Sequence, residues 1–293
     1  MNRGRWPVVA ALLVLAVSAC SPSAGGNPSA SASAEPSVAA SVEPSTSSDP
    51  STDPSPGSTP APVSRVPDGA LLPDLVMEPL ADWEIEYANN RRLLHVTTIF
   101  SNYGVGAFEL RGGRASGGTV MNLEQVIYTG GGSFELVPTR VDALYAGDGH
   151  NHWHAQQVVT MELANVLDPA HITNGNKIHF CFFDNTSTNE DLPGYDPDPY
   201  YSNTWCGTPD SSSIRMGLSI GYGDRYGYNF VGQYVDITNL PGGTYTLKAT
   251  VDASNNFFET NDADNCTMAR IQIPAAGEGA IVVVEAGQLD CPT

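Results

Sequence analysis

Hydrophobic and polar residues alternate with period two in several short segments of this chain. In the clearest, 245–251, Tyr245, Leu247, Ala249 and Val251 face one way while threonines and Lys248 face the other. The same pattern predicts strands over 93–100, 125–129, 157–163, 177–183 and 233–237. Clusters of glycine and proline separate these segments, and no long 3.6-residue periodicity accompanies them. We therefore expect a mainly β fold: a single antiparallel β-sandwich-like domain with loop-rich insertions.

The amino-terminal residues have the pattern of an export signal. Arg3 and Arg5 precede an apolar run over 8–17, which is too short to span a bilayer. Small residues then lead to Cys20, as in a bacterial lipobox, in which the cysteine is lipidated and becomes the new amino terminus. An ordinary secretory signal is the alternative. We expect an extracytoplasmic protein, anchored to a bacterial cell membrane through a lipid on Cys20, with its domain facing outside.

Composition divides the rest of the chain into two parts. Serine, proline and alanine dominate residues 21–66, a composition that cannot bury a core and is typical of a disordered spacer. Residues 67–293 are long enough for one large all-β domain. The predicted organisation is a lipoprotein signal peptide over 1–20, a linker over 21–66 and a β domain over 67–293.

The charge of the chain narrows the choice of partners. The formal net charge is −19, from 13 Lys+Arg against 32 Asp+Glu. Such a charge argues against nucleic acid and anionic membranes as partners, and it suits a cationic partner. The only lysines are Lys177 and Lys248, so chemistry that needs a lysine has two candidates.

Four cysteines remain besides Cys20, an even number that in an exported chain indicates two disulfides. Three pairings are possible. We favour Cys181–Cys206 and Cys266–Cys291 because these cysteines are neighbours in the sequence. A cysteine metal site is the weaker alternative because no Cys-x-x-Cys spacing occurs.

A histidine cluster is the most specific local feature. His150, His152 and His154 alternate with Asn151 and Trp153, so an extended segment would place the three imidazoles on one face. Three converging imidazoles form a facial metal site that suits Cu(II) or a catalytic Zn(II). Solvated histidines on an edge strand are the alternative interpretation.

Several short motifs, in order along the chain, resemble the lysyl oxidase family. The histidine cluster looks like the copper-binding histidines of that family. Further segments match it in sequence order: LLPDLV (71–76), KIHFC (177–181), GLSIGYGDRY (217–226), QYVDIT (233–238), 241–248 and 259–265. The resemblance covers about residues 70–266.

This resemblance implies a copper-dependent amine oxidase of the protein-lysine 6-oxidase type. His150, His152 and His154 would bind Cu(II), and a lysine tyrosylquinone cofactor would form from Lys177 and Tyr226. The implied reaction converts primary amines or peptidyl lysine to aldehydes with O₂, giving H₂O₂ and NH₃. Its partner would be a cationic primary amine or a lysine-containing protein.

Several roles stay open at this level. The register of the motif selects Tyr226 over Tyr222, Tyr228 and Tyr234. Asp224 and His179 are the candidates for the general base, and Asp148 for a partner of a ligand imidazole. Animal members of the family are richer in cysteine, and one of their cysteines corresponds to Tyr222 here. A long insertion over 185–204 is expected to reshape the substrate entrance.

Two other functions remain possible. A non-catalytic copper-binding surface lipoprotein would keep the histidines without a mature quinone. A zinc hydrolase would use the three histidines and a polarised water but would need neither Lys177 nor Tyr226.

Overall fold

A computed structural model describes residues 65–293 except 147–150, 178, 288–290 and 292–293. The described residues all lie in one of the two units into which the chain divides, Ser58–Thr293. The predictions for the signal sequence, for Cys20, for the linker up to residue 64, and for Asp148 and His150 therefore concern residues outside the described part. Within the described part, no helix has the length and apolar character needed to cross a bilayer.

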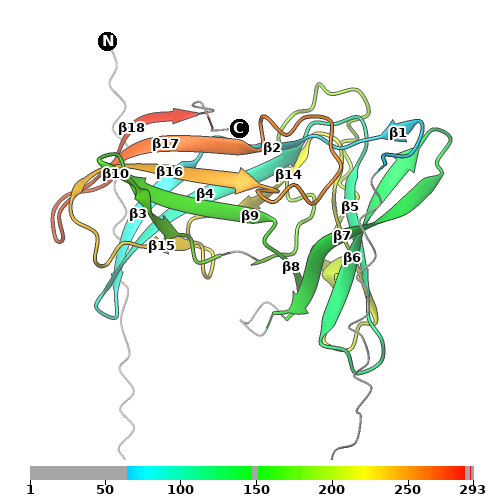
Figure 1. Ribbon diagram of the computed structural model, residues 1–293, viewed down its shortest axis with the longest axis horizontal. Helices are drawn as coiled ribbons and strands as arrows, with labels where there is room; N and C mark the ends of the chain where they lie inside the picture. Colours follow the sequence, from blue (N-terminus) through cyan, green and yellow to red (C-terminus); the bar gives the residue numbers. More distant parts are fainter. Residues whose placement is uncertain (1–64, 147–150, 178, 288–290, 292–293) are drawn as a thin grey trace, which may run out of the picture. The chain divides into compact units, whose positions relative to one another are not determined.

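The described strands form three antiparallel sheets (Figure 1). The first has the order β11 (His179–Phe180), β8 (Trp153–Gln156), β7 (Phe134–Tyr145), β6 (Val120–Thr129), β5 (Phe108–Gly113) and β13 (Ser213–Leu218), with β1 (Ala70–Leu71) beside β6. The second has the order β10 (Asp168–Asn174), β9 (Val159–Asn165), β16 (Gly243–Val251), β17 (Cys266–Ile273) and β18 (Val282–Gly287). The third has the order β12 (Thr186–Ser187), β14 (Tyr222–Tyr226), β4 (Arg91–Asn102) and β15 (Tyr234–Asp236), with β2 (Leu75–Met77) and β3 (Ala81–Ala88) also on β4. A short 3-10 helix, η1 (Asn203–Cys206), precedes β13.

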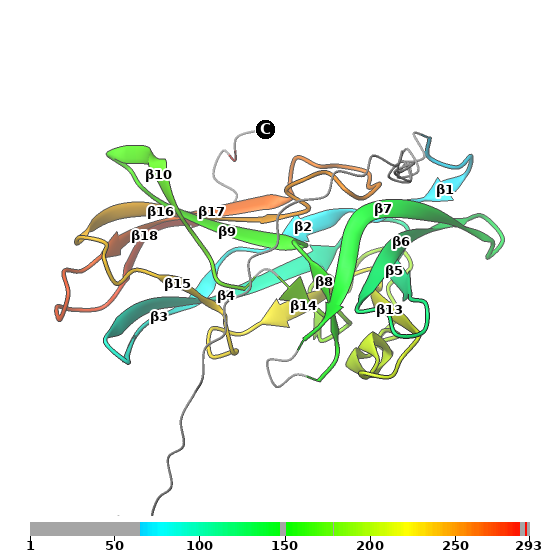
Figure 2. The same cartoon turned by 60° about the horizontal axis from the view of Figure 1, so that its bottom comes forward.

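The second and third sheets lie against each other and bury a common core. Figures 1 and 2 both show β9, β16 and β17 stacked over β4, and β2 contacts β16 and β17. Alternation along β16 places four side chains in this core, as predicted: Tyr245, Leu247, Ala249 and Val251. Burial of this apolar surface is the main stabilising contribution to the packing of the two sheets. The prediction of a mainly β, antiparallel fold is confirmed.

Most predicted strands are present, with two instructive differences. The segments 93–100, 125–129, 233–237 and 245–251 fall on β4, β6, β15 and β16. The segment 157–163 begins at Val159 because Gln157 has a φ of 55°, which separates β8 from β9. The predicted strand over 177–183 is reduced to β11, so its expected strict alternation is wrong: Cys181 is buried like Phe180 and Phe182.

A buried carboxylate joins the two strands at one edge of the first sheet. Arg111 on β5 lies directly opposite Arg215 on β13, a like-charge pair that is unfavourable by itself. The fully buried Glu109 offsets this repulsion because its Oε1 lies 2.6 Å from Arg111 Nε and 3.4 Å from Arg215 Nε. Its Oε2 accepts hydrogen bonds from the hydroxyls of Tyr128 and Tyr201 at 2.6 and 2.7 Å. Every acceptor site of this carboxylate therefore faces a donor.

Glu109→Gln is expected to lower the free energy of unfolding by about 3–5 kcal/mol, because it leaves two arginines facing each other without the buried charge. Urea unfolding at neutral pH measures the change. Glu135→Gln, which removes a charge from an exposed position on β7, is the matched control and should change stability by less than about 0.5 kcal/mol. Equal effects of the two substitutions would contradict this account of Glu109.

Candidate functional site

The end of the first sheet places the histidine cluster next to the segment that carries Lys177. Strand β8 pairs with β11, with His179 opposite Gln156 and Phe180 opposite Ala155. Trp153 begins β8, is fully buried, and donates from its indole nitrogen to the carbonyl of Thr208 at 2.9 Å. This buried anchor fixes the backbone between His152 and His154.

The histidine segment is less regular than predicted. A fully extended run over 150–154 is wrong, because Asn151 has a φ of 55° and the strand begins only at Trp153. Asparagine tolerates this left-handed conformation better than most residues. The convergence of His152 and His154 is nevertheless present, because Trp153 occupies the opposite side of the backbone in the core.

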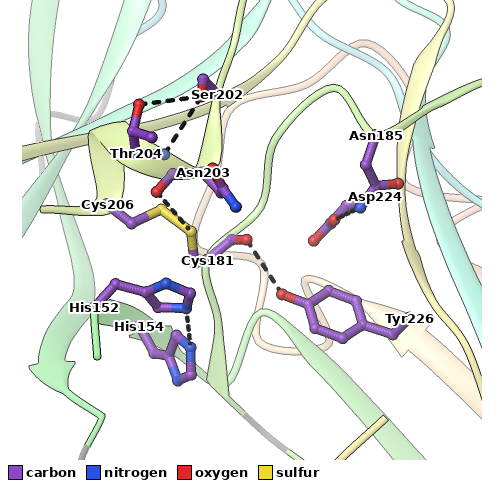
Figure 3. Close-up of a disulfide and its surroundings, with 10 residues drawn as sticks. All are labelled: His152, His154, Cys181, Asn185, Ser202, Asn203, Thr204, Cys206, Asp224 and Tyr226. Atoms are coloured by element: carbon purple, nitrogen blue, oxygen red, sulfur yellow. Dashed lines mark hydrogen bonds between the residues drawn. A yellow bond between two sulfur atoms is a disulfide. The ribbon is translucent and has the colours of Figure 1, made fainter. Parts of the chain in front are cut away.

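Two imidazole nitrogens meet in this segment. The Nε2 atoms of His152 and His154 are 2.8 Å apart, and His154 is only 3% exposed (Figure 3). Two nitrogen ligands about 2.0 Å from one metal ion and at a right angle to each other lie roughly 2.8 Å apart. The pair therefore fits two adjacent positions of a tetragonal Cu(II) ion better than those of a tetrahedral zinc ion, whose ligand nitrogens lie roughly 3.3 Å apart. Within the described ranges no three metal-binding side chains converge, and His150 lies outside those ranges.

The Cys181–Cys206 disulfide joins the two parts of the site. It ties the residue after β11 to the end of η1, with the Cα atoms 6.0 Å apart. The backbone carbonyl of Cys181 accepts a hydrogen bond from the Tyr226 hydroxyl at 3.2 Å, and Figure 3 shows the histidine pair to the left of this carbonyl and Tyr226 to its right. The second disulfide joins Cys266 to Cys291. Both favoured pairings are thus confirmed.

Lys177 and Tyr226, predicted from different motifs, lie together. Lys177 is only 6% exposed, and its Nζ lies 5.0 Å from the centre of the Tyr226 ring. The rings of Phe180 and Phe230 also face this nitrogen, at 5.5 and 6.0 Å. Strict alternation over 177–183 would place Lys177 on the face opposite Phe180, and that expectation is wrong. Regular pairing covers only His179–Phe180, so the Lys177 side chain does not follow the strand pattern and points into an aromatic cage. This cage consists of the rings of Phe180, Tyr226 and Phe230.

The competing tyrosines have other roles. The Tyr222 hydroxyl donates to the carbonyl of Asp196, and its ring stacks on Tyr195. Tyr234 contacts Arg91 near the molecular surface. Lys248, the other lysine, forms a partly exposed ion pair with Glu162.

Asp224 lies beside Lys177 and Tyr226 and has no exposed surface. Its Oδ1 accepts a hydrogen bond from Asn185 Nδ2 at 2.5 Å, and among the described residues Oδ2 has no hydrogen-bond partner. Burial raises the pKa of the Asp224 carboxyl well above its usual range, although the contact with Tyr226 and the charge of Lys177 oppose that change. The other proposed base, His179, lies on β11 opposite Gln156.

Two residues at the start of the insertion, Asp184 directly before it and Asn185 as its first residue, hold the site together, and the sequence pattern gave neither of them a role. Asp184 accepts hydrogen bonds from the backbone nitrogens of Tyr200, Tyr201 and Ser219 and from the Ser219 hydroxyl. Asn185 binds Asp224 through Nδ2 and accepts from the backbone nitrogen of Arg225 at 2.7 Å. An Asp-Asn pair directly after a hydrophobic run is a turn signal that could have identified them.

A family model for lysyl oxidase matches residues 123–283, which include every predicted site residue. The chain belongs to the lysyl oxidase family. The matched range contains all the family motifs named above except LLPDLV at 71–76. The sequence-based recognition of the family is confirmed.

Individual relatives of this lysyl oxidase family protein are distant. It is 26% identical over 124 residues to lysyl oxidase homolog 2 of Homo sapiens and 25% identical over 124 residues to that of Bos taurus. Each match covers 42% of this chain but only 14% of the relative. The chain therefore corresponds to a small part of those proteins.

Replacing both Cys181 and Cys206 by serine should lower the free energy of unfolding by about 2–4 kcal/mol. It should also change the environment of Tyr226, because the Cys181 carbonyl loses its fixed position. Unfolding measurements and the NMR resonances of labelled Tyr226 test the two effects.

The Cys266→Ser/Cys291→Ser variant is a matched control because both disulfides span 25 residues. It should lose a comparable amount of stability but leave the Tyr226 resonances unchanged. The prediction fails if both double variants shift those resonances equally.

Proposed function

We propose that this chain is a copper-dependent amine oxidase whose cofactor, lysine tyrosylquinone, forms from its own Lys177 and Tyr226. The observation that carries the proposal is the burial of the Lys177 ammonium 5.0 Å from the centre of the Tyr226 ring. A buried lysine beside a tyrosine adds little to stability. It does supply an amine next to a ring that it could modify.

His150, His152 and His154 would hold the copper ion. Neutral imidazole nitrogens suit Cu(II), and the 2.8 Å separation of two Nε2 atoms fits adjacent ligand positions. Burial of His154 and the Trp153 anchor keep these nitrogens in place. Copper would supply the oxidation of Tyr226 by O₂, and the quinone would supply the carbonyl at which primary amines are oxidised to aldehydes, with H₂O₂ and NH₃ released.

The remaining residues hold the reacting groups. Tyr226 is oriented by the hydrogen bond from its hydroxyl to the Cys181 carbonyl, and its ring faces Phe180 and Phe230 edge-on. The same aromatic rings exclude water from Lys177 Nζ, and such burial favours the neutral amine. Asn185 fixes the nearby Asp224 carboxyl, one of the two candidates for the general base.

The insertion favours a cationic substrate. Its loop carries exposed acids, including Glu190, Asp191 and Asp198, and Tyr195 stacks on Tyr222 of the strand that bears Tyr226. The negative electrostatic field of these acids attracts cationic amines or lysine-containing proteins. Two disulfides indicate an oxidising compartment. We further propose that residues 1–20 act as a lipoprotein signal, that 21–66 serve as a spacer, and that 67–293 form the catalytic domain.

Expression of the full chain with Cu(II) in air, followed by peptide mass spectrometry and quinone staining, tests the proposal. A covalent Lys177–Tyr226 peptide that is absent from Tyr226→Phe and from copper-free protein is the expected result. Tyr228→Phe and Lys248→Ala are controls that should retain it. Copper binding without the cross-link would instead favour the non-catalytic copper-binding lipoprotein, and zinc-dependent hydrolysis that survives Lys177→Ala would favour a hydrolase.

His152→Ala and His154→Ala should each weaken Cu(II) binding by at least tenfold and abolish the cross-link, because each removes one of the imidazole nitrogens proposed to bind copper. Competition with a chromophoric chelator measures the affinity. His171→Ala, on β10 in a different sheet, is the control and should leave the affinity unchanged. Unchanged affinity in both site variants would exclude this copper site.

A further inference from the structure

Among the described residues, Asp224 differs from Glu109, the other carboxylate with no exposed surface. Glu109 has both oxygens surrounded by arginine and tyrosine donors, as a structural carboxylate requires. Asp224 has a hydrogen bond from Asn185 to Oδ1 and a contact with Tyr226, and its buried Oδ2 has no hydrogen-bond partner among the described residues. A buried acceptor left without a donor costs about 1–3 kcal/mol, so a structural role alone does not explain it.

The surroundings of Asp224 contain one buried cation and one reactive ring. Figure 3 shows the Asp224 carboxyl on the same side of the site as the Tyr226 hydroxyl, and Lys177 Nζ lies over the Tyr226 ring. Lys177, Tyr226 and Asp184 are the titratable groups that influence Asp224. Asp184 already accepts four hydrogen bonds, from Tyr200, Tyr201 and Ser219.

Burial destabilises both charges of a buried carboxylate–ammonium pair. It penalises the carboxylate and the ammonium alike, so it favours transfer of a proton from the amine to the carboxyl. The resulting state has two neutral groups, which a low-dielectric site accommodates better than two separated charges. An amine must be neutral to act as a nucleophile.

We propose that Asp224 accepts the proton of the Lys177 ammonium during formation of the cofactor and so makes the amine nucleophilic. This inference rests on the proposed function. After the proton has moved from Nζ to Oδ2, the Nζ lone pair forms a C–N bond to the oxidised Tyr226 ring. One N–H bond of the amine and the C–H bond at that ring carbon then break. The two protons pass to the two ring oxygens, and the ring is reduced by two electrons. Dioxygen then removes two electrons and two protons as hydrogen peroxide.

Asp224→Asn is the direct test because it keeps the shape of the side chain and an acceptor for Asn185. At pH 7, peptide mass spectrometry should show at least a tenfold lower yield of the Lys177–Tyr226 cross-link, with copper affinity and oxidation of Tyr226 retained. The yield should recover as the pH approaches 10, where a lysine with a pKa of about 10.4 loses its proton without help. Asp196→Asn, in the loop packed on the same strand, should behave like the wild type.

The outcomes separate this inference from the proposed function. Absence of the cross-link in the wild type would overturn the proposed function. A wild-type yield in folded Asp224→Asn at pH 7, or a low yield that does not recover at high pH, would overturn the role of Asp224 alone. If Asp224→Asn does not fold, Asp224→Glu serves instead. Its cross-linking rate, measured when O₂ is admitted to copper-loaded anaerobic protein, should fall with acidification at a different midpoint from the wild type, and an identical midpoint would overturn the inference.

Discussion

The backbone at Cys181 is the constraint on which the candidate site depends. Residues on the first sheet supply the histidines, and a strand of the third sheet supplies Tyr226. Cys181 holds these parts together in three ways: its segment pairs with the histidine strand, its sulfur bonds to Cys206, and its carbonyl accepts the Tyr226 hydroxyl. A cross-link of this kind limits the freedom of the segment that leads back to Lys177, so a short pairing of only two residues in β11 suffices to position it.

Glu109 and Asp224 both have no exposed surface, so both carboxyl groups lose their hydration on folding, but their surroundings differ. Glu109 is saturated with donors, and its burial brings two opposed arginines and two tyrosine hydroxyls into one cluster. Tyr201 links this cluster to the chain that continues into η1 and Cys206. Asp224 has a hydrogen bond from Asn185 and a contact with Tyr226, its Oδ2 has no hydrogen-bond partner among the described residues, and its pKa is raised. Natural proteins tolerate such incompletely satisfied polar groups mainly where chemistry requires them, because elsewhere they only reduce stability.

Sequence periodicity predicted the parts of the fold that depend on a half-buried strand. Strand β16 is the clearest case, since its alternating side chains pack in one core. Periodicity failed where the chain leaves regular pairing: at Asn151 and Gln157, which have positive φ, and around Lys177, which turns toward Phe180. The motif resemblance still selected Lys177 and Tyr226 because residue identity, unlike backbone direction, is visible in the sequence. Asp184 and Asn185 were missed since their importance arises from long-range hydrogen bonds to segments that no local pattern connects.

A site built from separate sheets cannot exist in an unfolded chain. Lys177 reaches Tyr226 only after the first and third sheets have met, and the acceptor for the tyrosine hydroxyl is placed by a disulfide that closes at the same junction. On the proposed function, oxidation of Tyr226 therefore has to follow folding. An oxidising compartment would supply the conditions for both the disulfide and the proposed cofactor. On the same proposal, the aromatic cage excludes water, and Lys177 is the amine that the described residues place over the Tyr226 ring, so the identity of the cofactor would depend on correct folding.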